Sequence, residues 1–163
     1  MSNKIGKMYY SEVKFYDMKL KKNSTKQRPV LLINKSDATD YTALPISTIS
    51  NSNHINTIYD YKVDPAIFTK SGLIKISYIR TNKQLNVNLG DLGNFISDFK
   101  NDYPEEFEEV IKLNGTFNLS TITNELDNND AKDLINSVTN LFEDAATIIS
   151  EDNKGSKDNK DNK

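Results

Sequence analysis

The sequence of 163 residues contains no cysteine, no tryptophan and only one histidine. The lack of cysteine excludes disulfide bonds, thiolate zinc sites and cysteine nucleophiles. No window approaches the roughly 18 uninterrupted apolar residues of a membrane span, and the N-terminal residues lack the apolar region of a secretion signal. Glycine-rich phosphate loops and paired histidines are also missing. We therefore expect a cytoplasmic protein without a metal, a cofactor or a membrane partner.

Charge is present in quantity but is divided unevenly along the chain. Residues 1–101 carry 15 Lys and Arg against 8 Asp and Glu, a net charge of +7, whereas residues 102–163 carry 6 against 15, a net charge of −9. Clustered cations attract phosphate groups and raise their local concentration. The pattern favours a body that binds a polyanion, followed by an acidic extension, although a basic surface also serves solubility alone.

The first hundred residues contain short aliphatic and aromatic runs separated by polar turns. Residues 8–15 alternate at period two, which predicts a half-buried strand. Residues 29–34 (PVLLIN) predict a strand that begins at the proline and is buried on both faces. The polar residues 17–27 between them predict an exposed loop. Further strands are expected at 41–46, 58–63, 73–76 and 78–81. Their spacing is typical of an all-β sandwich or barrel.

After these strands, the pattern predicts helices. A first helix is expected from Phe95, because Asn94 can act as its N-cap. A second is expected around Pro104, with Asn114 and Gly115 ending it.

The C-terminal part of the chain is predicted to be helical and then disordered. Apolar residues recur at three- and four-residue steps within residues 130–149, which predicts an amphipathic helix. The final residues contain no apolar side chain that could offset the entropy of ordering them. We expect a barrel domain at 1–115, a helical extension at 116–150 and a disordered tail at 151–163.

Four segments occur in an order that carries a family resemblance. They are residues 4–15 (KIGKMYYSEVKF), 26–34 (KQRPVLLIN), 41–48 (YTALPIST) and 72–82 (GLIKISYIRTN). In this order they resemble the MazF/PemK toxins, in which a glycine and an aromatic strand precede Arg-Pro-Val and, later, Ile-Arg-Thr. The resemblance implies a mainly β fold with C-terminal helices, an SH3-like barrel of the MazF/PemK/CcdB-like type. It also implies a homodimer that binds single-stranded RNA and a cognate antitoxin protein.

The resemblance assigns positions in a metal-independent endoribonuclease of the mRNA interferase type. Arg28 and Ser47 take its catalytic places, with Thr48 beside Ser47 as an alternative. Ser47 keeps the hydroxyl of the threonine that is common in the family. Lys75 and Ser77 stand where some members have an arginine and an aspartate, so the positive charge is kept and the carboxylate is absent.

The chemistry of RNA cleavage explains why these residue types fit. RNA supplies its own nucleophile, the 2′-hydroxyl, so a protein needs to orient it and to stabilise the developing charge. An arginine remains protonated and can hold two phosphate oxygens at once. Arg28, predicted at the junction of a mobile loop and a rigid strand, is therefore the main candidate. Ser47 could donate a hydrogen bond to a phosphate oxygen, or it could be an ordinary residue at the end of a strand.

Other polar residues allow two interpretations each. Arg80, from Ile-Arg-Thr, fits a structural ion pair as well as an RNA contact. His54 lies in the polar segment 51–57, where a solvated side chain is the ordinary expectation and a catalytic or RNA-binding role is the alternative. The loop at 17–27 could either attract RNA phosphates or simply be solvated. Its candidate RNA-binding residues are Lys19, Lys21, Lys22, Lys26 and Gln27.

Two functions of other classes remain open. A CcdB-like toxin binds gyrase and requires no catalytic arginine, and the Arg-Pro-Val motif argues against it. An inactive homologue that only binds nucleic acid or a partner would account for serine at positions 47 and 77.

Overall fold

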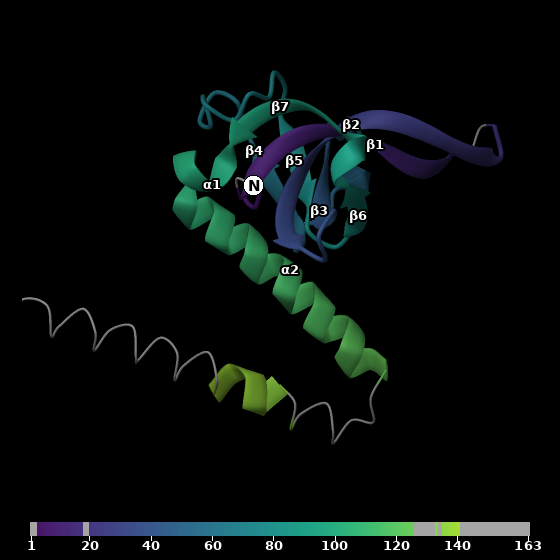
Figure 1. The fold of residues 1–163 in the computed structure, drawn as a ribbon. Coiled ribbons are helices and arrows are strands. Elements are labelled where there is room, and N and C mark those ends of the chain that lie inside the picture. Colours follow the sequence, from purple (N-terminus) through teal and green to yellow (C-terminus); the bar gives the residue numbers. More distant parts are fainter. Residues whose placement is uncertain (1–2, 18–19, 126–132, 134, 141–163) are drawn as a thin grey trace, which may run out of the picture. The chain divides into compact units, whose positions relative to one another are not determined.

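The computed structural model describes residues 3–17, 20–125, 133 and 135–140. The chain divides into two compact units, residues 1–117 and 118–163, and the sheet lies in the first (Figure 1). The elements in chain order are β1 (Lys7–Asp17), β2 (Lys22–Lys35), β3 (Asp40–Ser47), η1 (Ser52–His54), β4 (Asp60–Val63), β5 (Ser77–Arg80), β6 (Leu85–Asn88), η2 (Leu89–Asp91), β7 (Leu92–Asp98), α1 (Phe99–Asp102) and α2 (Pro104–Glu125).

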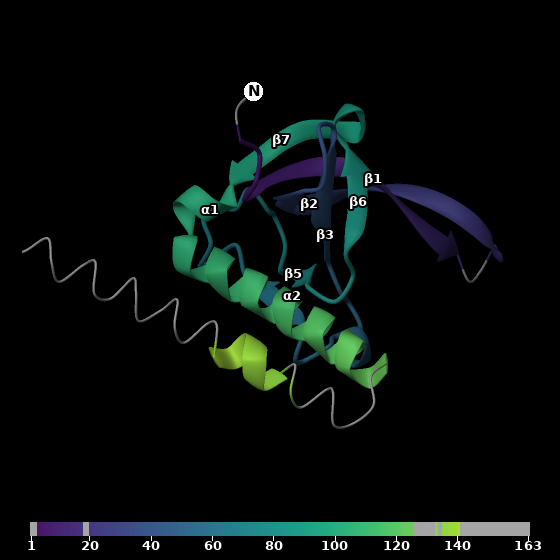
Figure 2. The same ribbon diagram turned by 60° about the horizontal axis from the view of Figure 1, so that its bottom comes forward.

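The seven strands form one antiparallel sheet in the order β4-β5-β3-β2-β1-β7, with β6 also paired to β3. One edge of β3 is divided between two partners, because Asp40 to Ala43 pair with β6 whereas Ile46 and Ser47 pair with β5. Among the described strands, no pairing joins β4 to β7, so the curled sheet is a half-barrel with a helix after it (Figures 1 and 2). The prediction of a mainly β fold with helices following the strands is confirmed.

The sheet is packed on both faces at its centre. Val30, Leu31 and Leu32 are consecutive residues of β2, and each has no exposed surface. Leu31 belongs to a core with α1 and α2, whereas its two neighbours point to the opposite face and pack with β6. Burying one such side chain contributes about 1.5–3 kcal/mol. The predicted burial of this segment on both faces is therefore confirmed.

A steric constraint explains why a glycine precedes the first strand. Gly6 has a φ of 85°, a value that residues with a Cβ rarely adopt. A Cβ at this position would collide with the side chain of Lys100. The backbone N–H of Gly6 donates to the carbonyl of Leu32 at 2.7 Å, and its carbonyl accepts from the N–H of Lys100 at 3.0 Å. Gly6 thus joins the start of β1 to β2 and α1.

Strands β1 and β2 form a hairpin that extends beyond the rest of the sheet (Figure 2). Their pairing runs without a break to Asp17 and Lys22. By contrast, β7 is last paired with β1 at Ser11, and β3 pairs with β2 only from Val30 onward. The prediction of an irregular loop at 17–27 was wrong for most of its length. Backbone hydrogen bonds hold an antiparallel pair together whatever its side chains, and polar residues are tolerated where both faces meet solvent.

The predicted helix from Phe95 is a strand instead. Phe95 pairs with Tyr9 across β7 and β1, and their rings meet edge to face with centroids 5.5 Å apart. The helix α1 begins at Phe99, and its N-cap is Asp98, whose side chain accepts from the N–H of Asn101 at 3.3 Å. A strand partner supplied by a distant part of the chain outweighs the local capping signal.

The long helix α2 begins as predicted, but its predicted end is wrong. Pro104 occupies its first position, and Phe107 and Val110 are buried in the core. The helix continues through Gly115 to Glu125. Gly115 does not have the positive φ that a helix-ending glycine adopts, so it costs only about 1 kcal/mol as an interior residue.

Two predictions about short strands also need correction. Residues 73–76 form no strand, whereas β6, at residues 85–88, was not predicted. Strand β6 is held by a full set of pairs with β3, which local sequence does not reveal.

The C-terminal predictions fall largely outside the described residues. Residues 133 and 135–140 are helical, within the predicted amphipathic helix at 130–149. The predicted tail at 151–163 lies outside the described part of the chain, and the domain boundaries remain predictions. Among the described residues, no helix combines the length and apolar character that crossing a membrane requires.

Candidate functional site

Arg28 and Ser47 are in direct contact. The guanidinium Nη1 of Arg28 donates a hydrogen bond of 2.8 Å to the hydroxyl oxygen of Ser47. Arg28 lies within β2 rather than at the predicted junction with a loop, and Ser47 is the last residue of β3. Pro29 follows inside the strand, where it is tolerated because β3 pairs with β2 only from Val30. Two residues that are 19 positions apart in sequence therefore meet on neighbouring strands.

The direction of this hydrogen bond leaves donors for a ligand. Because the Ser47 oxygen accepts from Arg28, the hydroxyl hydrogen of Ser47 points elsewhere. A guanidinium has five N–H groups, and this contact uses one of them. Both side chains are only partly buried, so an anion can approach them. The pair can offer two kinds of donor to one phosphate group.

An aromatic ring of the hairpin limits the position of Arg28. The ring centroid of Phe15 lies 5.7 Å from the Arg28 guanidinium carbon, a cation–π arrangement. Arg28 is opposite Ser11 in the register of β1 and β2, and Phe15 lies further out along the hairpin. The arginine thus has Ser47 and Phe15 as neighbours from two different strands.

A second group of hydroxyls lies beside the pair. The hydroxyl of Ser77 donates to the backbone carbonyl of Lys75 at 2.9 Å, and Thr48 Oγ1 lies 3.4 Å from Ser77 Oγ. Since Ser77 has one hydroxyl hydrogen, Thr48 is the donor in the longer contact. Ser77 is buried, whereas Lys75 is exposed. Of the predicted residues Thr48, Lys75 and Ser77, the structure brings the hydroxyls of Thr48 and Ser77 together. Lys75 takes part only through its backbone carbonyl, which accepts from Ser77.

Arg80 forms an ion pair with a carboxylate that sequence analysis did not identify. Its Nε lies 2.6 Å from Oδ1 of Asp60, and the two residues are directly opposite on β5 and β4. The Asp60 side chain has no exposed surface, and that of Arg80 is 14% exposed. Of the two interpretations of Arg80, a structural ion pair and an RNA contact, the ion pair therefore has an identified partner, Asp60. No local pattern marks Asp60 as the partner of Arg80, because the register of β4 and β5 depends on the fold.

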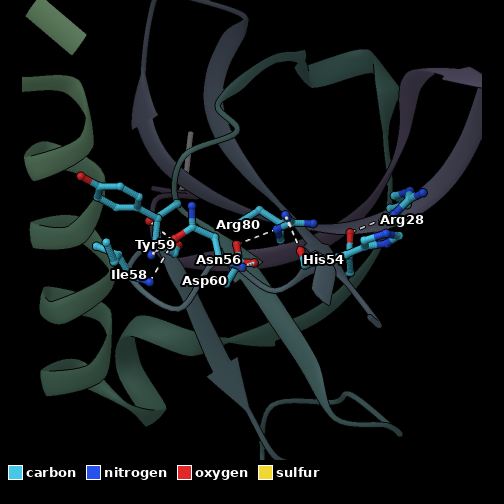
Figure 3. A network of polar contacts seen from close by, with 9 residues as sticks. Arg28, His54, Asn56, Ile58, Tyr59, Asp60 and Arg80 are labelled. Carbon is cyan, nitrogen blue, oxygen red and sulfur yellow. Dashed lines mark hydrogen bonds and ion pairs between the residues drawn. The ribbon is translucent and has the colours of Figure 1, made fainter. Parts of the chain in front are cut away.

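The same ion pair holds the segment between β3 and β4 (Figure 3). Arg80 Nη2 donates to the backbone carbonyl of His54 at 3.5 Å. The second oxygen of Asp60 accepts from the backbone N–H of Asn56 at 2.7 Å. The side chain of Asn56 in turn accepts from the N–H groups of Ile58 and Tyr59, each at 3.0 Å. One buried carboxylate thus holds Asn56 directly and His54 through Arg80.

The predicted RNA-binding residues lie along the hairpin. Lys22 and Lys26 are exposed, and they alternate along β2 on the same face as Arg28. Lys21 has a φ of 48° and lies in the turn before β2. Gln27 precedes Arg28 and is exposed. Lys19 lies outside the described residues.

The fold and the site together define a small antiparallel β protein with an arginine–serine pair at the meeting of its central strands. Among solved structures, the chain is similar to the Mycobacterium tuberculosis toxin MazF-mt6, with 20% identity and a TM-score of 0.44 over 64% of this chain and 91% of that chain. It is also similar to a structure of an Mtb toxin, with 20% identity and a TM-score of 0.44 over 55% of this chain and 91% of that one. No family model matches the chain, and no curated protein matches it.

Proposed function

We propose that this chain is the toxin of a type II toxin–antitoxin system and a sequence-specific endoribonuclease. The observation that carries the proposal is the contact between Arg28 and Ser47 at 2.8 Å. These are the two residues to which the resemblance with MazF/PemK toxins assigns catalysis, and they come from separate segments of the sequence. The basic face of the hairpin adds support, because it presents lysines beside the pair.

In the proposed reaction, the 2′-hydroxyl of RNA attacks the adjacent phosphorus. The bond from the 2′-oxygen to phosphorus forms as the bond to the 5′-oxygen breaks, which leaves a 2′,3′-cyclic phosphate and a 5′-hydroxyl. Negative charge grows on the phosphate oxygens in the transition state. Donors already fixed in place stabilise that charge without reorganising. Arg28 and the hydroxyl of Ser47 fill this role, and the attack itself requires no metal.

The basic hairpin is proposed to attract single-stranded RNA in the cytoplasm. Lys21, Lys22 and Lys26 would bring RNA to the pair through phosphate contacts that carry no sequence information. A second copy of the chain and a cognate antitoxin are the proposed protein partners.

The decisive experiment is induced expression followed by mapping of new RNA 5′ ends. The proposed function requires growth arrest with cuts at a common short motif in cellular RNA. The purified protein should cut an oligonucleotide containing that motif in the presence of EDTA. Growth arrest without new 5′ ends would favour the gyrase-binding alternative. Absence of both effects would favour an inactive binding protein.

A further inference from the structure

The chain's one histidine lies on a segment whose backbone is held by several hydrogen bonds. His54 ends the short helix η1, whose N-cap is Asn51, with its side chain accepting from the N–H of Asn53 at 3.0 Å. The carbonyl of His54 is bound by Arg80, and Arg80 is fixed by buried Asp60. The backbone is therefore held while the imidazole faces solvent.

This anchor attaches His54 to β5, the strand that pairs with β3 at Ser47. Ser47 is opposite Tyr78 in the register of β3 and β5, and Arg80 lies two residues further along β5. In Figure 3, His54 lies between Arg80 and Arg28. The segment that follows Ser47 is tied to β5 at the carbonyl of His54, so the histidine stays beside the strand that neighbours β3.

We propose that His54 is the general base of the cleavage reaction. The proposal rests on the endoribonuclease function proposed above. It assigns to His54 the proton of the 2′-hydroxyl, and it gives the Asp60–Arg80 pair the task of positioning the histidine.

The other side chains near the pair are poorly suited to this task. Arg28 remains protonated and has no lone pair to accept a proton. The serine and threonine hydroxyls are weak bases. Asp60 has both oxygens engaged, one by Arg80 and one by the N–H of Asn56, and its side chain is inaccessible to RNA. A neutral imidazole both accepts a proton and remains accessible.

Neutral His54 removes the proton of the 2′-hydroxyl while the 2′-oxygen bonds to phosphorus. The bond from phosphorus to the 5′-oxygen breaks, and the 5′-oxygen takes a proton from solvent water. The protonated imidazole returns its proton to solvent, so each turnover leaves the protein unchanged.

The test compares His54→Ala with Asn53→Ala in the full chain. Asn53 is the neighbouring exposed residue, and its contact to Asn51 uses a backbone N–H that the substitution keeps. The substrates are two oligonucleotides with the mapped motif, one natural and one with sulfur replacing the 5′-oxygen at the scissile bond. A sulfur leaving group needs no protonation, so it removes the demand for a general acid but not for a base.

We expect His54→Ala to lower cleavage of both substrates by about a hundredfold or more. Its affinity for a non-cleavable 2′-deoxy oligonucleotide and its melting temperature should stay at the wild-type values. Asn53→Ala should cleave both substrates at the wild-type rate. If His54→Ala does not fold, His54→Gln is measured in its place against the same criteria.

Other results would overturn the assignment. Wild-type cleavage by a folded His54 variant would exclude the histidine from catalysis. Full recovery on the sulfur substrate would make His54 an acid instead of a base. A loss of affinity as large as the loss of rate would make it a binding residue. These failures differ from failure of the proposed function, in which the wild-type chain itself cuts no RNA.

Discussion

Arg28 donates one N–H group to the hydroxyl of Ser47, and its other N–H groups are proposed to bind a phosphate. If those donors act mainly on charge that appears in the transition state, Arg28→Ala should lower cleavage by about a hundredfold or more while RNA binding is nearly unchanged. Arg28→Lys should restore little, because an ammonium group cannot form the same fork. Single-turnover cleavage and binding of a 2′-deoxy oligonucleotide separate the two effects.

The matching control for Arg28 is Thr25 on the same strand. Thr25→Ala shortens an exposed side chain of β2 and should leave the single-turnover rate within about threefold of wild type, since a lost exposed contact is worth no more than about 0.5 kcal/mol. Native cleavage by Arg28→Ala with an unchanged melting temperature would refute the catalytic assignment.

The Asp60–Arg80 pair is expected to stabilise the fold as well as to position His54. Asp60→Ala leaves the largely buried Arg80 without its partner, and breaking a buried pair in this way costs about 3–5 kcal/mol. Urea unfolding monitored by circular dichroism measures the change. Lys62→Gln is the control, because its pair with Asp64 is at the surface, with Lys62 53% exposed, and should change stability by less than about 1 kcal/mol. Equal, small effects from both variants would show that the Asp60–Arg80 pair does not hold this region.

At the scale of elements, helix α2 places carboxylates near a tyrosine of β4. Burial, together with Glu109 and Glu106, raises the pKa of Tyr61 to about 12. In the unfolded chain the phenol ionises near its ordinary pKa of about 10. The folded state therefore holds the proton more tightly, and this contribution to stability is complete below pH 10 and is lost as the pH rises towards 12.

Ultraviolet titration of the phenolate tests this expectation for Tyr61. One tyrosine should ionise near pH 12, and its transition should be absent from Tyr61→Phe. The variant should also lose less stability than the wild type between pH 10 and 12. A wild-type titration in which every tyrosine ionises near pH 10 would contradict the prediction.

The hairpin of β1 and β2 should determine how RNA affinity depends on salt. Lys26 lies on the face of Arg28, whereas Lys35 is at the other end of the same strand. If Lys26 contacts one phosphate, Lys26→Gln should reduce the slope of log affinity against log salt by about 0.7, the value for one contact with a single strand. Lys35→Gln should leave the slope unchanged. Fluorescence anisotropy at several salt concentrations distinguishes the two, and identical slopes would mean that the hairpin does not contact RNA.

The hairpin and β7 also show where element prediction from sequence succeeds and fails. The consecutive apolar residues of β2 identified a central strand, because only a strand covered on both faces can bury them all. Lys22 to Gln27 gave no strand signal, since their pairing depends on backbone groups of β1. Phe95 follows a good capping residue but pairs with Tyr9, which lies far away in sequence.

At the scale of the whole molecule, the candidate site could be predicted only where a motif carries it. Arg28 and Ser47 were chosen from the order of segments, and the structure brings their side chains into contact, while their catalytic role stays a prediction. Asp60 was missed because its importance arises from the register that places it opposite Arg80. A charged residue at the start of a short strand has no local feature to distinguish it from a solvated one.

This chain is predicted to form a homodimer, as the resemblance to MazF/PemK toxins implies. Its interface should be isologous, with the same patch on both copies. Light scattering at micromolar concentration should give about twice the 18.5 kDa of one chain. A mass of one chain under these conditions would contradict the prediction.

The length of the hairpin beyond its neighbours has a consequence for solubility. Between Glu12 and Tyr16 on β1 and between Lys22 and Arg28 on β2, no further strand pairs with the hairpin within the described residues. Both outer edges are therefore templates onto which another chain could add as a strand, and charged side chains on such edges oppose aggregation. Lys14 on β1 and Lys22 and Lys26 on β2 are the lysines of these edges and oppose such association, and for Lys22 and Lys26 this is in addition to their proposed attraction for RNA. Replacing all three with neutral residues would make the chain prone to edge-to-edge association as well as weakening its proposed attraction for RNA.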